Sequence, residues 1–344
     1  MSDRPRFSWG AILSLAIGLF LMWLIFRQIN PQEFVGALQQ TKWGWIASAL
    51  ACGLLSHLFR ALRWAQLAQP LGHRPAAHKA FYAVMSGYLA NLALPRLGEI
   101  TRCLLLARKT PLGFNGLVGT VVMERLMDLL VLLLLSLVTL VAYRDLLLEP
   151  VWNFVRLHIG WNGILLTTTG LLLAFSFGFW TWKFGGRLIP LPQPVRKVLQ
   201  GIGEGMAGLG RLDQPGLFVV YTLLIWLGYL MMTYLCFFAF PGADSLGLGE
   251  ALLLLVAGAF GFVMPVQGGM GAYHAAIVWT LGLLPNLNMS LTNALAFATL
   301  SHLAQTVLVV VVGGLSYFLM SLIQDDPSVT TGAKDPTLPV PPHA

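Results

Sequence analysis

Long apolar runs separated by short polar stretches dominate the sequence. Six of these runs are long enough to cross a bilayer as helices, which takes about 20 residues. They cover residues 9–26, 43–62, 113–142, 161–182, 216–239 and 291–322. The runs are rich in leucine and lack a two-residue alternation of apolar and polar positions. The pattern therefore predicts spanning α-helices rather than spanning strands.

Two further apolar segments contain helix breakers. Residues 80–95 end at Pro95, and residues 250–284 are interrupted by Pro265 and by several glycines. We expect each of them to enter the membrane and return to the side from which it came. The pattern as a whole then predicts an all-α polytopic membrane protein with eight membrane segments, of which six span the membrane and two are broken, re-entrant segments.

The order of these segments repeats along the chain. Two spans, a broken segment and a span make up residues 9–142, and the same order recurs in residues 161–322. The broken segments are weakly alike, since SGYLANLALPRLGE and AGAFGFVMPVQGG each carry a glycine before the proline and another after it. We therefore expect an inverted repeat. In transporters, paired segments of this kind in matching positions indicate the binding site.

The composition agrees with a membrane protein, because 57% of the residues are hydrophobic and 10% are charged, against about 25% charged in soluble domains. In the layout above, most of the 21 lysines and arginines fall on one side, which the positive-inside rule identifies as the cytoplasm. We expect a multi-pass protein of the inner membrane with both termini cytoplasmic. Residues 1–324 would form the membrane domain, and the polar, proline-rich residues 325–344 a disordered tail.

Several classes of site are missing from the sequence. There is no GxxxxGK[ST] loop, so no ATP site is predicted, and no serine nucleophile elbow, HExxH motif, metal-ligand spacing or Rossmann glycine pattern occurs. The net charge of +7 lies mostly on the expected cytoplasmic flanks, so a nucleic-acid partner is not indicated. We expect no cofactor, no metal and no enzymatic activity.

The stretch NLALPRLGEITR, residues 91–102, is the first candidate site. Pro95 disfavours helix before it, and a new helix can begin there with the proline in its first turn. The free N–H groups of that helix, with Arg96 and Arg102, would suit a phosphate. Glu99 stands one turn from both arginines and is a candidate ion-pair partner. The alternative interpretation is a cytoplasmic flank that follows the positive-inside rule.

The span 113–142 carries Glu124 and Asp128 on one helical face. Ionisable groups at this depth cost about 2.5–3.5 kcal/mol each, so they are functional candidates by default. The alternative is a buried ion pair with Arg96 or Arg102 that fixes helix packing.

Other candidates occur in two further stretches. In FVMPVQGGMGAYH, Gly268 and Gly269 allow positive φ or close backbone approach, and His274 could carry a proton or act as a packing residue. At the end of the second span, Arg60 and Arg63 could assist an anion site, or could extend their head groups to the membrane surface as snorkelling side chains.

The motifs LPRLGEITR, VVMERLMD and MPVQGGMGAYH, preceded by RALRW, together resemble the flippase-like family, whose members are similar to the membrane-spanning half of lysylphosphatidylglycerol synthase. The resemblance covers about residues 10–322. It implies two re-entrant elements meeting at a central cavity and the movement of a lipid, or a lipid-linked group, between leaflets. Family members often carry a glutamate at the position of His274, so this chain departs from the pattern there. The synthase's soluble aminoacyl-transfer domain has no counterpart in this sequence, so lipid synthesis is not implied.

We therefore expect a lipid translocator whose partner is an anionic phospholipid or a lipid-linked substrate. The alternatives are a membrane-embedded enzyme acting on a lipid phosphate or polyprenyl carrier, and a non-transporting accessory protein for envelope synthesis. A homo-oligomer or a complex with an envelope enzyme also stays open.

Overall fold

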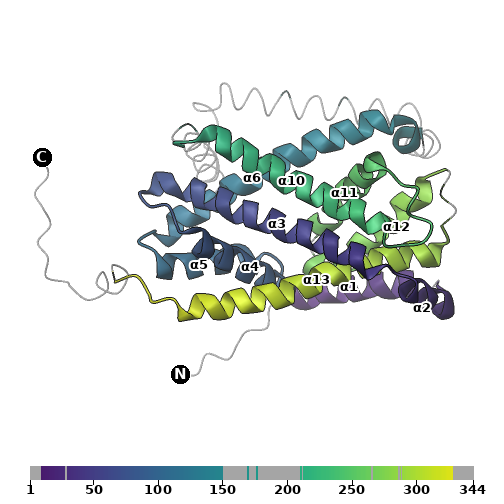
Figure 1. The fold of residues 1–344 in the computed structure, drawn as a ribbon, viewed down its shortest axis with the longest axis horizontal. Helices are drawn as coiled ribbons and strands as arrows, with labels where there is room; N and C mark the ends of the chain where they lie inside the picture. Colours follow the sequence, from purple (N-terminus) through teal and green to yellow (C-terminus); the bar gives the residue numbers. More distant parts are fainter. Residues whose placement is uncertain are drawn as a thin grey trace, which may run out of the picture.

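The computed structural model describes residues 9–27, 29–149, 212–264, 266–285 and 289–327, with the single positions 169, 176, 210 and 287. Every regular element in these residues is a helix (Figure 1). The long helices are α1 (Trp9–Phe26), α3 (Trp43–Ala68), α6 (Phe114–Ala142), α10 (Pro215–Phe237) and α13 (Leu291–Leu322). The shorter elements are α2 (Pro31–Gln39), α4 (Ala77–Ala93), α5 (Leu97–Lys109), α11 (Leu248–Val263) and α12 (Ala272–Leu283), with the 3₁₀ turns η1 (Gln69–Leu71) and η2 (Gln267–Gly269).

In the described part of the chain, four helices are long and apolar enough to cross a membrane. They are α6, α10, α13 and the stretch Trp43–Leu71, which is α3 extended by η1. These helices confirm four of the predicted spans, and α1 is helical over the predicted residues 9–26. The predicted span 161–182 and the tail beyond residue 327 lie outside the described residues. The all-α, multi-pass membrane class is thus confirmed for the part of the chain that the structure describes.

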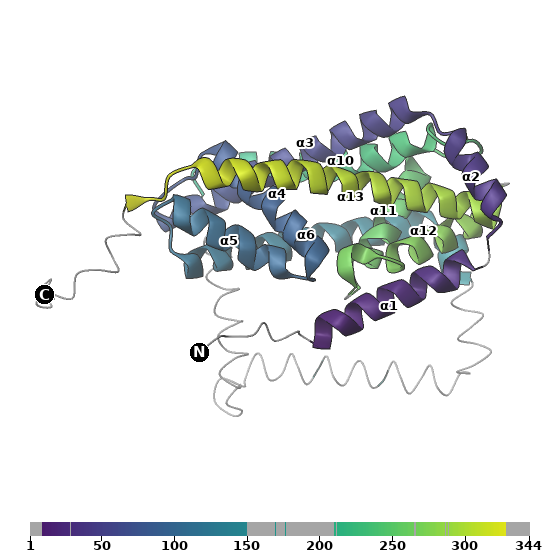
Figure 2. The ribbon, with the colours of Figure 1, turned by 90° about the horizontal axis from the view of Figure 1, so that it is seen from below.

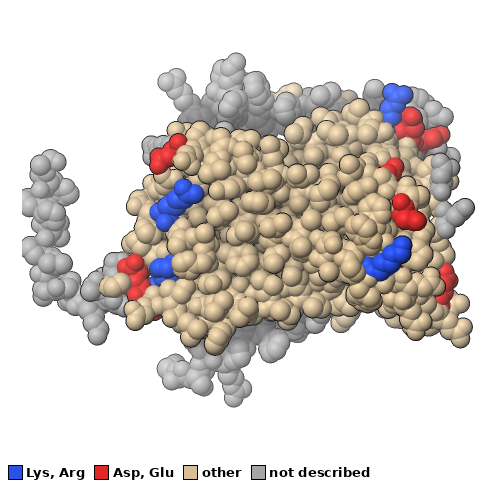
Figure 3. All heavy atoms as spheres, in the orientation of Figure 1, with Lys and Arg blue, Asp and Glu red and all other residues tan. Residues whose placement is uncertain are grey.

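The surface agrees with a position in a bilayer. The face in Figure 3 carries its charged side chains near the two ends of the long axis, with a wide band free of charge between them. Large apolar side chains are exposed on the long helices, among them Val311 and Phe318 of α13. A soluble monomer rarely exposes so large an apolar surface to water, whereas the lipid tails of a membrane can cover it. This distribution of charge agrees with a long axis close to the membrane normal.

Helix α2 is an element that the hydrophobic pattern did not predict, because it lies between the predicted spans 9–26 and 43–62. Its start is fixed by Asn30, whose side-chain oxygen accepts hydrogen bonds from the N–H groups of Gln32, at 3.0 Å, and Glu33, at 3.5 Å. Pro31 stands in the first turn, where its missing N–H costs nothing. The capping sequence NPQE could have revealed this helix, although it is too short to span.

The first broken segment is a helical hairpin in which α5 packs back against α4. Between the helices, the Leu97 N–H donates to the Leu94 carbonyl at 3.2 Å, and Arg96 has φ 66° and ψ 1°. Proline at the second position and a left-handed third residue are the pattern of a type II turn. The predicted break is confirmed. The prediction that Pro95 occupies the first turn of the new helix is wrong, because the left-handed Arg96 separates the two.

Two glycines let the helices of this hairpin approach closely. A Cβ atom added to Gly98 of α5 would lie 2.1 Å from the carbonyl oxygen of Gly87 in α4. The Gly98 N–H lies in the first turn of α5 and has no acceptor within that helix. It donates to the side-chain oxygen of Asn91 at 2.7 Å. Asn91 therefore satisfies a helix N-terminus from across the hairpin.

The second broken segment is also a hairpin, with α12 packed against α11. Helix α11 ends at Val263, and the chain then turns through η2 before α12 begins. Gly268, Gly269 and Gly271 have φ of 57°, 74° and 77°, so of the two roles considered for Gly268 and Gly269, positive φ is present at both. Residues with a side chain rarely adopt these angles, so the glycines allow the tight reversal.

The two hairpin ends meet, although they are far apart in the sequence. The side-chain amide of Gln267 donates to the Ala93 carbonyl at 3.1 Å, and a ring nitrogen of His302 lies 2.8 Å from the Gly268 carbonyl. Helix α1 packs along the second hairpin, on α12 and η2 (Figure 2). The two breaks therefore contact each other, while Leu94, Arg96 and Met264 remain exposed at the surface.

We predict that Gly98→Ala destabilises the protein, because the added methyl group collides with the backbone of Gly87 rather than with a flexible side chain. Gly119→Ala is the matched control, since a Cβ at Gly119 meets nothing within 4 Å. It should raise stability by about 0.5–1 kcal/mol through helix propensity alone. Thermal unfolding in detergent measures both, and a Gly98→Ala protein as stable as the control variant would show that α4 and α5 are not in contact there.

Candidate functional site

Helix α6 supplies two carboxylates to the interior. Glu124 and Asp128 are four residues apart, which places them on one face of the helix. The Glu124 side chain is fully buried, and 13% of the Asp128 side chain is exposed. A carboxylate at this depth needs a positive partner or several hydrogen-bond donors, and α3 and α5 provide them.

Helix α3 contributes Arg60 and Arg63, one turn apart. One Arg60 nitrogen donates to Glu124 at 2.7 Å and to Asp128 at 2.6 Å, and Arg63 donates to Asp128 at 2.6 Å. Arg63 also donates to the Thr222 hydroxyl on α10 at 3.2 Å. Because both side chains are buried, the interpretation of Arg60 and Arg63 as snorkelling side chains is wrong. Helix α3 continues past residue 62 to Ala68, so these arginines lie inside the helix rather than at its end.

Helix α5 contributes Arg102. Its Nη1 atom donates to both Glu124 oxygens, at 3.0 and 3.3 Å. The guanidinium group lies 4.8 Å from the ring centre of Trp64 on α3, a favourable cation–π position. The Trp64 indole N–H in turn donates to the Thr120 hydroxyl at 2.9 Å. Of the two arginines considered for Glu124, the structure thus selects Arg102.

A more exposed pair borders this network. Arg125, with 44% of its side chain exposed, lies 3.5 Å from Glu99 and 3.8 Å from Glu124. Glu99 was expected to pair with Arg96 or Arg102, but its partner in the structure is Arg125. The contact is longer than those of the interior, so the border of the network is its weakest part.

The network has more positive than negative charge. Among the described residues, its four arginines, Arg60, Arg63, Arg102 and Arg125, face the three carboxylates named above. Within the described residues, the buried Nε and Nη2 atoms of Arg102 and one buried oxygen of Glu99 have no hydrogen-bond partner. Asn91, Glu99, Arg102 and Arg125 line a cavity of about 10 Å³ between the first hairpin and α6. That volume is enough for about one water molecule.

Arg96 does not join the network. It is exposed at the turn between α4 and α5, and its left-handed backbone is the only positive φ at a non-glycine position among the described residues. A residue held in this conformation carries a local backbone cost, which is often found at functional positions.

The second hairpin brings together His274, His302 and Tyr273. His274 is 2% exposed, its ring centre lies 5.0 Å from that of His302, and its Nδ1 atom has no partner within the described part of the chain. The Gly268 carbonyl oxygen belongs to this group, because a ring nitrogen of His302 contacts it. Gly269 packs against Phe262. These residues line the end of the second hairpin and make no ion pair with the arginine network among the described residues.

Some participants were not predicted as site residues. Arg60 is flanked by the Tyr229 ring, at 6.0 Å, and the His57 ring lies 4.8 Å from that of Tyr88. Trp64 lies in the motif RALRW beside Arg63, and Arg125 lies in VVMERLMD beside Glu124. Only the neighbouring residues were predicted as site residues. Aromatic residues are common in apolar helices, so their sequence gave no signal of contact with arginine. No group of three or more histidine, cysteine or acidic side chains suited to a metal occurs in the described ranges.

Comparison with protein-family models matches residues 11–313 to the model described as "Lysylphosphatidylglycerol synthase TM region". The comparison with curated proteins and the comparison with solved structures each gave no match. The matched residues include both hairpins and the whole arginine–carboxylate network. The resemblance inferred from the motifs is confirmed, and the family's description indicates a role connected with membrane lipids. The chain belongs to the lysylphosphatidylglycerol synthase transmembrane-region family.

Proposed function

We propose that the chain moves an anionic phospholipid, or a lipid-linked group carrying a phosphate, between the leaflets of the membrane. The observation that carries this proposal is Arg102. Its guanidinium group is buried within a membrane helix bundle, belongs to a network with excess positive charge, and keeps two nitrogens without a described partner. Such a group is costly in an apolar medium unless a ligand uses it, and a phosphate oxygen is the acceptor that its planar fork fits.

The ion pairs alone are a weak reason for this arrangement. Buried ion pairs can often be replaced by apolar residues without loss of stability. Here Glu124 forms an ion pair with Arg60, and Asp128 forms one with Arg63. Arg102 of the first hairpin also forms an ion pair with Glu124. A phosphate could replace Glu124 as the partner of Arg102 without leaving Glu124 unpaired, since Arg60 remains bonded to it.

In the arrangement described, the site is closed. A cavity for one water is too small for a phosphate, so α5 and α6 must separate before a headgroup can enter. The border pair Arg125–Glu99 is the contact that would break first, because it is long and partly exposed. Arg96, exposed at the turn of the hairpin, is placed to attract the headgroup before entry.

We further propose the finer architecture of six spans and two re-entrant hairpins arranged as an inverted repeat. The meeting of the hairpin ends supports it, since Gln267 reaches the backbone of Ala93. In this architecture each half would open in turn around a site near the membrane centre. The protein would itself perform no chemical conversion, and it would reside in the inner membrane with both termini in the cytoplasm.

The transport prediction uses proteoliposomes with a fluorescent phosphatidylglycerol in one leaflet, whose exchange is followed by quenching from outside. We expect exchange by the unaltered protein and a loss of about tenfold or more for Arg102→Gln, because a charge-assisted hydrogen bond is lost. Arg108→Gln, on the same helix but exposed, should keep the activity.

A second pair of variants separates cargo contact from folding. Arg102→Gln leaves Glu124 with fewer partners, which can itself destabilise the protein, and the added change Glu124→Gln removes that imbalance. If the double variant restores the yield of folded protein but not the exchange of lipid, Arg102 contacts cargo. If it restores exchange as well, Arg102 is only a counter-ion and the proposed site is wrong.

Arg96 gives an independent prediction. Arg96→Gly should raise stability by about 1–2 kcal/mol, because glycine adopts positive φ without strain. It should also slow lipid exchange at low ionic strength, whereas Arg96→Lys, which keeps the charge, should not. Rates measured at low and high salt test this, since only attraction by an exposed charge is screened. Equal rates for the glycine and lysine variants would remove Arg96 from the mechanism.

The topology is tested by single cysteines on a cysteine-free background. Ser245 follows α10 and His73 follows η1, and both positions are exposed. A membrane-impermeant maleimide added outside intact cells should label Ser245→Cys and not His73→Cys. Labelling of residue 73 alone would reverse the orientation, and labelling of both from outside would contradict the proposed number of crossings.

A further inference from the structure

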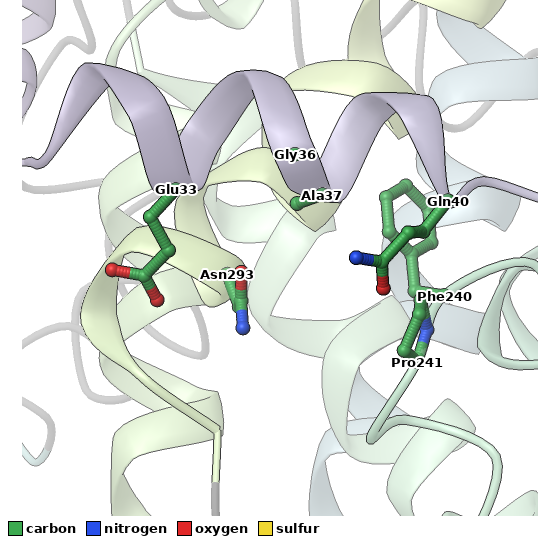
Figure 4. Close-up of a pocket in the computed structure, with 7 residues that line it drawn as sticks. All are labelled: Glu33, Gly36, Ala37, Gln40, Phe240, Pro241 and Asn293. Carbon is green, nitrogen blue, oxygen red and sulfur yellow. The ribbon is translucent and has the colours of Figure 1, made fainter.

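A second cavity lies at the other end of the molecule from the first hairpin, beneath α2 (Figures 1 and 4). Its volume is about 190 Å³, and it is a partly open pocket lined by α2, the loop that follows α10 and the first turn of α13. Three of its lining side chains are polar: Glu33, Gln40 and Asn293. Phe240 and Pro241 form an apolar side. None of the described residues that line it is basic, in contrast to the arginine network.

The walls of this cavity are held by specific contacts. The Asn30 N–H donates to the Thr292 hydroxyl at 3.4 Å, and the Ser290 hydroxyl donates to Glu33, so both ends of the first α2 turn are tied to α13. The Lys42 N–H donates to the Ala239 carbonyl at 2.9 Å, which ties the end of the α2 segment to the loop after α10. The cavity is therefore formed before any ligand arrives, as most binding pockets are.

The polar groups in the cavity have unused hydrogen-bonding capacity. Figure 4 shows that the side chains of Glu33 and Gln40 leave α2 on the face of the helix where Asn293 and Pro241 lie. Within the residues that the structure describes, neither the Gln40 nor the Asn293 carboxamide is hydrogen-bonded. Each carboxamide offers both an N–H donor and a carbonyl acceptor, while Glu33 offers acceptors only when ionised.

This combination selects among ligand classes. A phosphate is disfavoured, because the cavity has a carboxylate and no positive side chain. An ammonium group has donors only, so it would use the acceptors and form no bond with the carboxamide N–H groups. A hydroxyl group both donates and accepts, so several neighbouring hydroxyls satisfy all three side chains, and the carbon side of such a molecule packs on Phe240. The volume is below that of pockets for drug-sized ligands, which begin at about 300 Å³, so the ligand is small.

We propose that this cavity binds a small uncharged polyol, such as the glycerol or the sugar end of a lipid headgroup. Its position at an end of the apolar band places it where headgroups lie. The inference rests on the cavity alone and not on lipid translocation, so it stands or falls separately from the proposed function.

The test is ligand-observed NMR by saturation transfer, with the full chain in phosphatidylcholine nanodiscs. The probes are free glycerol, free glucose, dihexanoyl phosphatidylglycerol and dihexanoyl phosphatidylethanolamine. We expect saturation of the hydroxyl-bearing probes and not of the ethanolamine group. Saturation of phosphatidylglycerol without free glycerol identifies a lipid as the source of the polyol, whereas saturation of the free polyols identifies a soluble ligand; either result supports the site.

Three variants locate the binding. Gln40→Ala should weaken it about three- to tenfold, the value of one or two hydrogen bonds, while Gln39→Ala, one residue away and outside the cavity, should not. Gly36→Leu should abolish binding by filling the space, and it should fold, because a Cβ at Gly36 meets nothing within 4 Å. The proposal is overturned if no hydroxyl-bearing probe is saturated, if ethanolamine binds more strongly, or if Gly36→Leu and Gln40→Ala bind as well as Gln39→Ala.

Discussion

The ion pairs of Glu124 and Asp128 fix the relative positions of α3, α5 and α6. The interior of an apolar bundle solvates a charge poorly, so an arginine on one helix is stabilised by a carboxylate on another. Arg60 and Arg63 are one turn apart on α3 and face carboxylates one turn apart on α6. This matched spacing sets both the rotation and the height of α6 against α3, and removal of either carboxylate would leave a buried arginine uncompensated, at about 3–5 kcal/mol.

The first hairpin is the part that this network leaves least constrained. Among the described residues, it is linked to the network by Arg102, which contacts Glu124 through a single nitrogen, and by the longer Glu99–Arg125 contact. The close contact of Gly87 with Gly98 makes α4 and α5 one rigid unit, so the hairpin would move as a body rather than bend. In the proposed mechanism a headgroup phosphate competes for Arg102 while α3 and α6 keep their own ion pairs. Selectivity for anions then follows from the excess positive charge.

Much of the fold could be predicted from the sequence, but the pairing inside the site could not. The apolar runs predicted the spans that the structure describes, and proline and glycine predicted both breaks. The four-residue spacing of Glu124 and Asp128 predicted a common face. The burial of Arg60 and Arg63 was missed, because a charge at the end of an apolar run looks the same whether it reaches the surface or a carboxylate on a distant helix. The choice of Arg102 over Arg96 depends on a left-handed turn, and arginine at such a position has no local signal.

The most direct test of the account is native mass spectrometry of the protein released from membranes, with identification of the lipid that remains bound. The account predicts that the unaltered protein retains a lipid with a phosphate-containing headgroup. It also predicts that Arg102→Gln loses this lipid, while the exposed control Arg108→Gln retains it. Equal retention by the two variants, at equal yields of folded protein, would contradict the claim that Arg102 holds the headgroup.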